Sequence, residues 1–215
     1  MILQPVLIRI PYWPNLSGPQ RVERQRTFAR IALDHCAKLC GASAGPWAQT
    51  PERVPIPRDG FHWSIAHKPR FAAAVIAPTP VGIDIESITP RTRDLSTAVA
   101  SPEEWAIMNH SRDPKQSHDR KGADKKNVSV AWRTFFEVWT AKEAVLKANR
   151  VGIGALKQCR ITGKDMPGRL TLSYADKSWT VQFLEYGGHL AAVACADQPV
   201  RWHIMEPAAS EHPAA

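Results

Sequence analysis

The chain has 215 residues, of which 44% are hydrophobic, enough to bury one large core or two small fused ones. No apolar run reaches the roughly 18 residues that a membrane-spanning helix needs, so we expect no membrane partner. The formal net charge of +8 favours anionic partners such as nucleic acid, phosphorylated cofactors or acidic proteins.

The N-terminal half predicts strands around one basic helix. Residues 3–10 follow no basic leader or cleavage site, and their apolar run indicates the first strand of a cytoplasmic protein. Residues 20–39 have apolar side chains at helical spacing, arginines in their first half and Gly41 as a stop. After a proline-rich loop, three segments predict a small antiparallel unit, at residues 61–67, 70–77 and 81–87.

The C-terminal half predicts helices followed by strands. The segment SPEEW at residues 101–105 is typical of a helix start, since it offers an N-cap serine, a proline and early glutamates. Residues 111–129 are polar and net basic without apolar periodicity, which indicates a mobile loop. Residues 134–150 form the clearest helix. Four strands are then predicted, with Gly187-Gly188 as a hairpin turn, at residues 158–162, 169–174, 178–186 and 189–195.

This order of elements, strand then helix then strands, occurs once in each half. We therefore predict an α+β protein of two similar lobes, each with a small antiparallel sheet packed with helices. The lobes cover residues 1–100 and 101–205, and residues 206–215 are a disordered tail. The four cysteines form no C-x-x-C pair, which favours packed thiols over a disulfide framework or a zinc site.

The segment VGIDIES at residues 81–87 alternates apolar and polar residues, as a half-buried strand does. This alternation places the carboxylates of Asp84 and Glu86 on one face, two residues apart. Taken alone, such a pair indicates no more than a strand edge that faces solvent.

On the helix at 134–150, Trp139, Glu143 and Lys147 recur every four residues and share a face. A neighbouring stripe is apolar and is predicted to enter the core, at Phe135, Val138 and Val145. Glu143 and Lys147 therefore lie at the margin of a buried face. Taken alone, a Glu–Lys pair at this spacing is usually a solvated helix pair.

Taken together, the strand motif and the helix motif indicate a metal site, which neither motif indicates alone. Three carboxylates from a strand and a helix, with a lysine one turn further on, suit Mg²⁺, which prefers oxygen ligands and shares them with substrate phosphates. The lysine would neutralise phosphate charge or protonate a leaving oxygen. The predicted chemistry is a metal-assisted attack at a phosphate.

At these two motifs the chain resembles the Sfp-type 4′-phosphopantetheinyl transferase family. That family pairs G-[IV]-D-[IVL]-E with a later [FW]-x-x-[WF]-[TS]-x-K-E-[AS]-x-x-K, and here the two segments are VGIDIE and FFEVWTAKEAVLKA. The arginine-rich helix and the segment FHWSIAHKPRFAAAVI are also similar to family segments, so the likeness covers roughly residues 20–162. The resemblance implies a monomer whose two lobes are related by a pseudo-twofold axis, with the active site at their junction.

The resemblance also implies roles at the metal. Asp84, Glu86 and Glu143 would hold Mg²⁺ at the pyrophosphate of coenzyme A. Glu143, or a water on the metal, would take the proton from a carrier-protein serine, which attacks the β-phosphate and releases 3′,5′-ADP. Lys147 would stabilise charge on the bridging oxygen. Positioning and charge neutralisation dominate such phosphoryl-group chemistry.

The remaining implied contacts are with coenzyme A. Lys142 and His67 would bind its phosphates, with His67 at the 3′-phosphate, and Arg26 and Arg58 would add basic contacts. The chain departs from the family at two places. Ala66 stands where a serine is usual before the histidine, and Lys68 could compensate. The proline-rich loop lacks the family's lysine, for which Arg53 or Arg58 could substitute.

The resemblance implies an acidic carrier protein of fatty-acid, polyketide or nonribosomal peptide synthesis as the partner. A basic surface would steer both this carrier and the polyanionic coenzyme A. We expect the basic residues of the loop at 111–129 to affect the carrier encounter more than the chemistry, namely Arg120, Lys121, Lys125 and Lys126. A solvated linker with no role is the alternative for this loop.

Two other classes of function stay open from the residues alone. A Mg²⁺-dependent nuclease shares the carboxylates and the lysine, but such enzymes commonly place the glutamate and lysine two apart on a strand, and no aromatic stripe interleaves with the basic residues here. A non-enzymatic binder of an acidic partner would explain the charge but leave the carboxylates without a purpose. We therefore expect no nucleic-acid partner.

Overall fold

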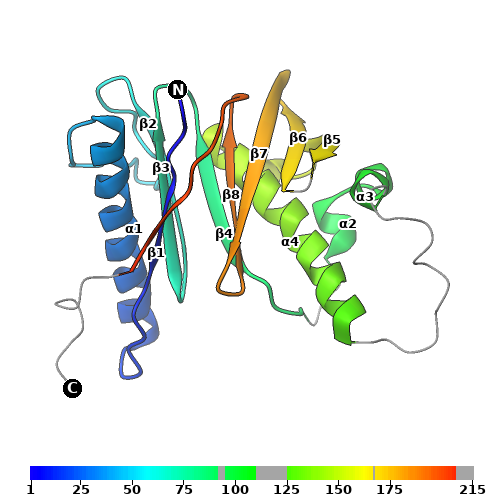
Figure 1. Cartoon of the computed structure of the whole chain (residues 1–215), viewed down its shortest axis with the longest axis horizontal. Helices are drawn as coiled ribbons and strands as arrows, with labels where there is room; N and C mark the ends of the chain where they lie inside the picture. The colour runs from blue at the N-terminus through cyan, green and yellow to red at the C-terminus, as the bar shows by residue number, and fades with distance from the viewer. Residues whose placement is uncertain (92–94, 110–124, 167, 207–215) are drawn as a thin grey trace.

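The structure is a computed structural model that describes residues 1–91, 95–109, 125–166 and 168–206. Its elements stack as a helix, two sheets face to face, and a second helical layer (Figure 1). Each sheet buries both faces, one against the other sheet and one against its own helix. The described residues include no helix long and apolar enough to cross a membrane.

The first sheet carries the basic helix on its outer face. Its strand order is β2-β3-β1-β9, and all pairs are antiparallel except β1 with β9. These elements are β1 (Val6–Arg9), α1 (Gly18–Cys40), β2 (His62–Lys68), β3 (Phe71–Ala77) and β9 (His203–Met205). The helix ends as predicted, because Gly41 adopts the left-handed conformation with φ of 68° that closes a helix without a Cβ clash.

The second sheet is wholly antiparallel, with the order β4-β8-β7-β6-β5. Its strands are β4 (Gly82–Ser87), β5 (Arg160–Met166), β6 (Arg169–Tyr174), β7 (Lys177–Tyr186) and β8 (His189–Cys195). Its outer face packs on the long helix, and the helical elements are α2 (Ser96–Val99), α3 (Pro102–Asn109), α4 (Lys125–Ala148) and η2 (Ile153–Ala155).

The two sheets meet along the edge strands β2 and β4, which lie side by side (Figure 1). The apolar residues of β4, Ile83 and Ile85, pack between the sheets with Ala66 of β2. One hydrogen bond also crosses this junction, from the Ile83 N–H to the Ser64 hydroxyl at 3.1 Å. The polar face of β4 is therefore turned toward α4, next to the junction.

The predicted α+β class, with two sheets packed against helices, is confirmed. The grouping of residues 81–87 with the two preceding strands is wrong, because β4 pairs with β8 in the second sheet. Period-2 alternation shows which face of a strand is buried, but it does not identify the hydrogen-bonding partner. The lobe boundary at residue 100 stays a prediction.

Two further sequence expectations change. The predicted loop at 111–129 is wrong at its end, because the backbone is helical from Lys125. The first turns of this helix are polar, so they show no apolar spacing that would predict a helix. The rest of that loop, with Arg120 and Lys121, lies outside the described residues. The short strand β9 was not predicted, and most of the predicted tail at 206–215 also lies outside them.

Candidate active site

A cavity of about 380 Å³ opens where β2 and β4 meet, and all four layers contribute to its wall. Its polar lining comes from α1, the following loop, β2, β4 and α4: Arg26, Arg30, Gln49, Arg53, His67, Lys68, Asp84, Glu86, Glu143 and Lys147. Trp139, Ile65 and Ala66 complete the lining. The two sequence motifs supplied Asp84, Glu86, Trp139, Glu143 and Lys147 of this set. The distant carboxylates of β4 and α4 therefore do converge.

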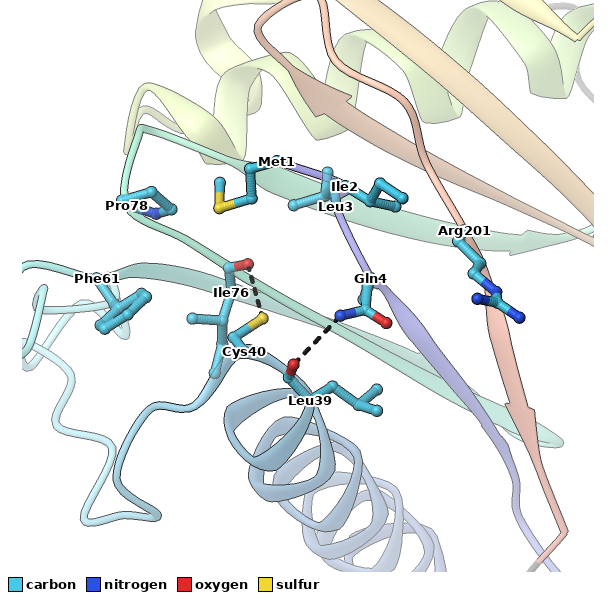
Figure 2. A pocket seen from close by; sticks show the side chains of 10 residues that line it. All are labelled: Met1, Ile2, Leu3, Gln4, Leu39, Cys40, Phe61, Ile76, Pro78 and Arg201. Atoms are coloured by element: carbon cyan, nitrogen blue, oxygen red, sulfur yellow. Dashed lines mark hydrogen bonds between the residues drawn. The ribbon is translucent and has the colours of Figure 1, made fainter.

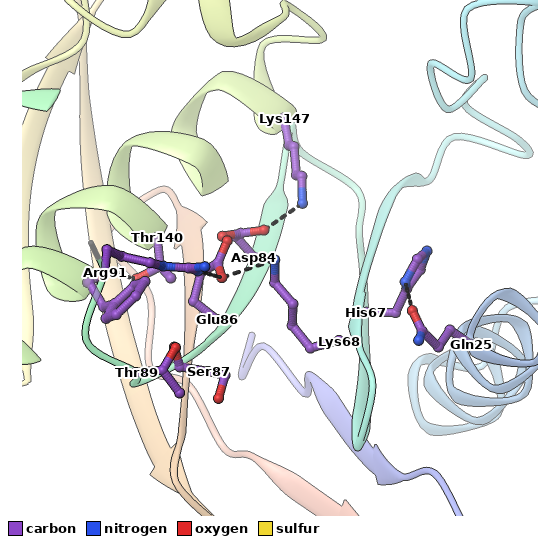
Figure 3. Close-up of polar contacts among 11 residues, drawn as sticks. Gln25, His67, Lys68, Asp84, Glu86, Ser87, Thr89, Arg91, Thr140 and Lys147 are labelled. Atoms are coloured by element: carbon purple, nitrogen blue, oxygen red, sulfur yellow. Dashed lines mark hydrogen bonds and ion pairs between the residues drawn. The ribbon is translucent and has the colours of Figure 1, made fainter. Parts of the chain in front are cut away.

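The alternation of β4 explains why its carboxylates reach this cavity. Gly82, Asp84 and Glu86 share the face that is opposite to the buried isoleucines. Gly82 packs directly on the α4 backbone, since a Cβ there would lie 2.0 Å from the Ala144 carbonyl oxygen. This close approach lets Lys147 Nζ of α4 donate to Asp84 Oδ1 at 2.7 Å (Figure 3).

The acidic group is buried and rich in negative charge. Asp84 and Glu86 are each only 7% exposed. Burial, followed by the negative charge of Asp84, raises the pKa of both Glu86 and Glu143 above the ordinary glutamate value. Among the described residues, Asp84 Oδ2 has no hydrogen-bond partner. The site therefore presents a buried carboxylate oxygen with unused acceptor capacity.

Basic side chains surround these carboxylates. Lys68 Nζ lies 2.9 Å from Glu86 Oε2, and Arg91 lies 3.7 Å from the same oxygen (Figure 3). The Arg91 guanidinium also lies over the Phe136 ring, 5.4 Å from its centroid. Cations that balance carboxylates in this way can also bind the phosphates of an incoming anionic substrate.

His67 and Lys68 lie on opposite faces of β2, and so they approach the cavity from two sides. Lys68 reaches β4, whereas His67 turns toward α1, where its Nδ1 lies 2.8 Å from Gln25 Oε1 (Figure 3). Burial, followed by the positive charge of Lys147, lowers the pKa of His67. The positively charged form of His67 is therefore disfavoured while no anion occupies the cavity, and one ring nitrogen is engaged by Gln25.

The structure separates two predicted residues from the rest. Among the described residues, the cavity lining does not include Arg58 or Lys142. Arg58 is engaged elsewhere, with its guanidinium on the Ala44 carbonyl oxygen at 2.9 Å and over the Trp47 ring, while Arg53 lines the cavity instead.

The expected contact of Lys142 with coenzyme A phosphates is at odds with its position. Its side chain is fully buried, and Nζ lies 2.7 Å from Glu104 Oε1 of α3. Consecutive helix residues differ by about 100° in direction, so Lys142 turns away from the cavity that its neighbour Glu143 lines. Sequence adjacency alone did not show this difference.

The donor set fits a hard divalent cation such as Mg²⁺. Oxygen atoms are the ligands that this ion prefers, and it is usually held by one or two carboxylates together with waters and substrate phosphate oxygens. The orphaned Asp84 Oδ2 and the mutual repulsion of the carboxylates are relieved by such a charge. No three His, Cys, Asp or Glu side chains in the described part of the chain are already gathered as a metal cluster.

A second cavity, of about 330 Å³, lies at the other end of α1 (Figure 2). Its lining is mainly apolar, including Met1, Ile2 and Leu3 against Phe61. Arg201 is its one charged side chain among the lining residues, and no carboxylate accompanies it. The acidic cavity is therefore the better candidate for catalysis.

Some functional neighbours had no signal in the sequence. Gln25 and Arg91 contact the site only because different layers meet there, and neither belongs to a motif. Arg30 and Gln49 line the cavity as well. The crowding of arginines on α1 did indicate a basic wall, but not which arginine faces the site.

Comparison with known proteins gives two findings. Residues 80–196, more than half of the chain, match the family model of the 4′-phosphopantetheinyl transferase superfamily. A 4′-phosphopantetheinyl transferase of Bacillus subtilis is 27% identical over 93 residues, which are 43% of this chain and 35% of that protein. The chain thus matches about a third of the length of this curated relative. The matched family region includes β4 and α4 but not β2 or α1.

Proposed function

This chain belongs to the 4′-phosphopantetheinyl transferase superfamily, and from this we propose that it transfers 4′-phosphopantetheine from coenzyme A to a serine of an acidic carrier protein. The observation that carries the proposal is the convergence of Asp84, Glu86 and Glu143 with Lys147 in one cavity walled by basic side chains. Such a cavity suits a polyanionic substrate whose pyrophosphate is the reacting group.

The bond changes follow from that substrate. The serine oxygen forms a bond to the β-phosphorus of coenzyme A, and the bond from this phosphorus to the bridging oxygen breaks, so that 3′,5′-ADP leaves with the electron pair. Glu143 accepts the serine proton, and its place in the cavity lining beside Lys147 supports this role. Lys147 stabilises the negative charge on the bridging oxygen.

Asp84, Glu86 and Glu143 are the residues proposed to hold Mg²⁺. When bound, the ion would neutralise pyrophosphate charge and so reduce the repulsion that opposes attack. Lys147 and Lys68 already balance two of these carboxylates, and they are therefore positioned to move onto phosphate oxygens as the substrate enters.

The basic wall is proposed to bind the nucleotide part of coenzyme A. His67 contacts the 3′-phosphate, and Lys68, Arg26 and Arg53 contribute positive charge around it. Ala66 supplies no hydroxyl here, which supports a larger share for these charged neighbours. Lys142 and Arg58 have no part in this proposal.

The partner is proposed to be an acyl or peptidyl carrier protein, met by a monomer in the cytoplasm. The net charge of +8 supports steering of an acidic partner. A carrier role for Arg120, Lys121, Lys125 and Lys126 stays a prediction.

The test is incubation of the protein with an acidic apo-carrier, coenzyme A and Mg²⁺, followed by intact-mass spectrometry of the carrier. The proposal expects the mass of one phosphopantetheine group on a single serine, and an equal amount of 3′,5′-ADP. A nuclease would instead cut nucleic acid and leave the carrier unmodified, and a simple binder would change neither, so either result contradicts the proposal.

Variants connect the activity to the cavity. Asp84→Asn should lower kcat by about 100-fold, the order expected for loss of a preorganised charge at a transition state. Asp176→Asn is the matched control, because it makes the same change in charge at an exposed turn between β6 and β7. Equal activity of the two variants would show that the cavity is not the active site.

A further inference from the structure

One carboxylate, that of Glu104, joins the helices α3 and α4 to the strand β5 of the second sheet. Its Oε2 accepts a hydrogen bond from the Ser101 N–H at 2.8 Å, and the Ser101 hydroxyl accepts one from the Glu104 N–H at 3.4 Å, which together cap α3. Its Oε1 accepts a hydrogen bond from the Ile161 N–H of β5 at 2.8 Å. The same Oε1 lies 2.7 Å from Lys142 Nζ of α4.

This arrangement is unusual in its burial. A capping-box glutamate ordinarily lies at the surface, yet Glu104 is 5% exposed, and the exposure of Lys142 is 0%. The surroundings are the apolar cluster between α4 and the second sheet, with Cys159 beside the pair. Among the described residues, Lys142 Nζ has no well-directed hydrogen bond, so the charge of Glu104 is what balances it.

The rest of the buried α4 interface is mainly apolar. Ala144 and Ala148 permit the close approach of Gly82, and larger residues fill the core around them, namely Phe136, Val138, Val145 and Leu146. Apolar contacts are not directional, and other ion pairs of α4 with the sheet, such as Arg133–Glu185 and Lys147–Asp84, involve partly exposed side chains. A buried ion pair is directional, and rotation of α4 would pull Lys142 away from Glu104, its one counter-charge among the described residues.

We propose that Glu104 and Lys142 are a positioning pair that sets the rotation of α4, and thereby aims Glu143 and Lys147 at the carboxylates of β4. Lys142 directly precedes Glu143, so a rotation that breaks the pair also moves Glu143 along the cavity wall. The motif lysine therefore acts from behind the helix and does not touch the substrate. This inference rests on the proposed function for its activity readout, but its structural readout does not.

The pair is tested with Lys142→Met, Glu104→Gln and the double variant. Removing one partner leaves a buried charge without its partner and lowers the melting temperature, whereas removing both relieves that penalty. The double variant should therefore melt closer to the wild type than Glu104→Gln does. Matched controls are the exposed neighbours Glu103→Gln and Lys157→Met, which should behave as the wild type.

The readouts that separate positioning from simple stability are Mg²⁺ affinity, kinetics and geometry. In the folded double variant, the dissociation constant for Mg²⁺ alone, measured by isothermal titration calorimetry, should rise about tenfold, as for loss of a residue that orients metal ligands. The kcat should fall while the KM for coenzyme A stays within about twofold. A crystal structure of the variant should show Lys147 Nζ displaced from Asp84 Oδ1.

A double variant with wild-type Mg²⁺ affinity, wild-type kcat and an intact Lys147–Asp84 contact overturns the proposal. If the double variant does not fold, Lys142→Met is measured in the same way, because Glu104 then keeps its two backbone N–H partners. Failure of the proposed function gives a different result. The wild type then shows no transfer, while a shift of Lys147 in the variant structure would still support the positioning pair.

Discussion

At the residue scale, His67 is oriented by a residue of another layer. Its Nδ1 contacts Gln25 Oε1 at 2.8 Å, which leaves the other ring nitrogen for a ligand in the cavity. Gln25→Leu should raise the KM for coenzyme A about fivefold, as expected for one hydrogen bond worth about 1 kcal/mol. The KM for 3′-dephospho-coenzyme A, measured in parallel, should not change.

The comparison of the two substrates isolates the 3′-phosphate. Gln158→Leu, at an exposed position outside the cavity, is the control and should alter neither KM. If Gln25→Leu weakens both substrates equally, then the pair of Gln25 and His67 does not read the 3′-phosphate. His67→Ala should give the same pattern as Gln25→Leu, with a larger effect.

The residues that sequence reasoning found are those whose spacing repeats within one element. Asp84 and Glu86 share a strand face, and Glu143 and Lys147 share a helix face, so each pair was predictable alone. Contacts between layers were not predictable, since Gln25 meets His67 only through packing of α1 on the first sheet. The position of Lys142 outside the cavity was not predictable from the motif, because consecutive helix residues point in directions about 100° apart.

At the element scale, the site depends on the contact of β4 with α4. Gly82→Ala should lower the free energy of unfolding by about 1–3 kcal/mol, the usual cost of overpacking, because its Cβ would meet the Ala144 carbonyl oxygen at 2.0 Å and Ala148 N at 2.6 Å. The backbone atoms there cannot move aside as a flexible side chain could. The helix must shift off the strand, so kcat should also fall.

Denaturant unfolding and steady-state kinetics check this prediction. Gly152→Ala is the matched control, because a Cβ at that position meets no atom within 4 Å. A Gly82→Ala protein with unchanged stability would mean that β4 and α4 are not in backbone contact. Normal kcat in a destabilised variant would mean that their spacing does not set the geometry of the site.

The elements themselves were largely predictable, and their pairing was not. Periodicity predicted α1, the second half of α4 and most strands, because each buries one clear face. The partner of β4 depends on where the chain crosses after Pro80, and both sheets could accept its apolar face. β9 has only three residues, too few to show an alternation of apolar and polar side chains. It pairs with β1 from the other end of the chain, and no local sequence pattern identifies so distant a partner.

At the scale of the whole molecule, the cavity concentrates like charges at the junction of the two sheets. The pKa of Glu86 and of Glu143 is raised, so the folded protein binds these protons more tightly than the unfolded chain. Their stabilising contribution is present below the ordinary glutamate pKa, and it is lost as the pH rises through the raised values. Protonation or cation binding at this junction should therefore change the free energy of unfolding of the whole protein.

Mg²⁺ should therefore stabilise the protein more at neutral pH than near the ordinary glutamate pKa, where protons occupy the same oxygens. Mass action gives about 2.7 kcal/mol at a concentration 100 times the dissociation constant. Thermal melts across this pH range, with Mg²⁺ or with a chelator, measure the difference. In Glu143→Gln, removing one repelling charge should reduce both the loss of stability on raising the pH in chelator and the gain from Mg²⁺. An equal Mg²⁺ effect at all pH values, or one that Glu143→Gln retains in full, would show that the cation binds elsewhere on the molecule.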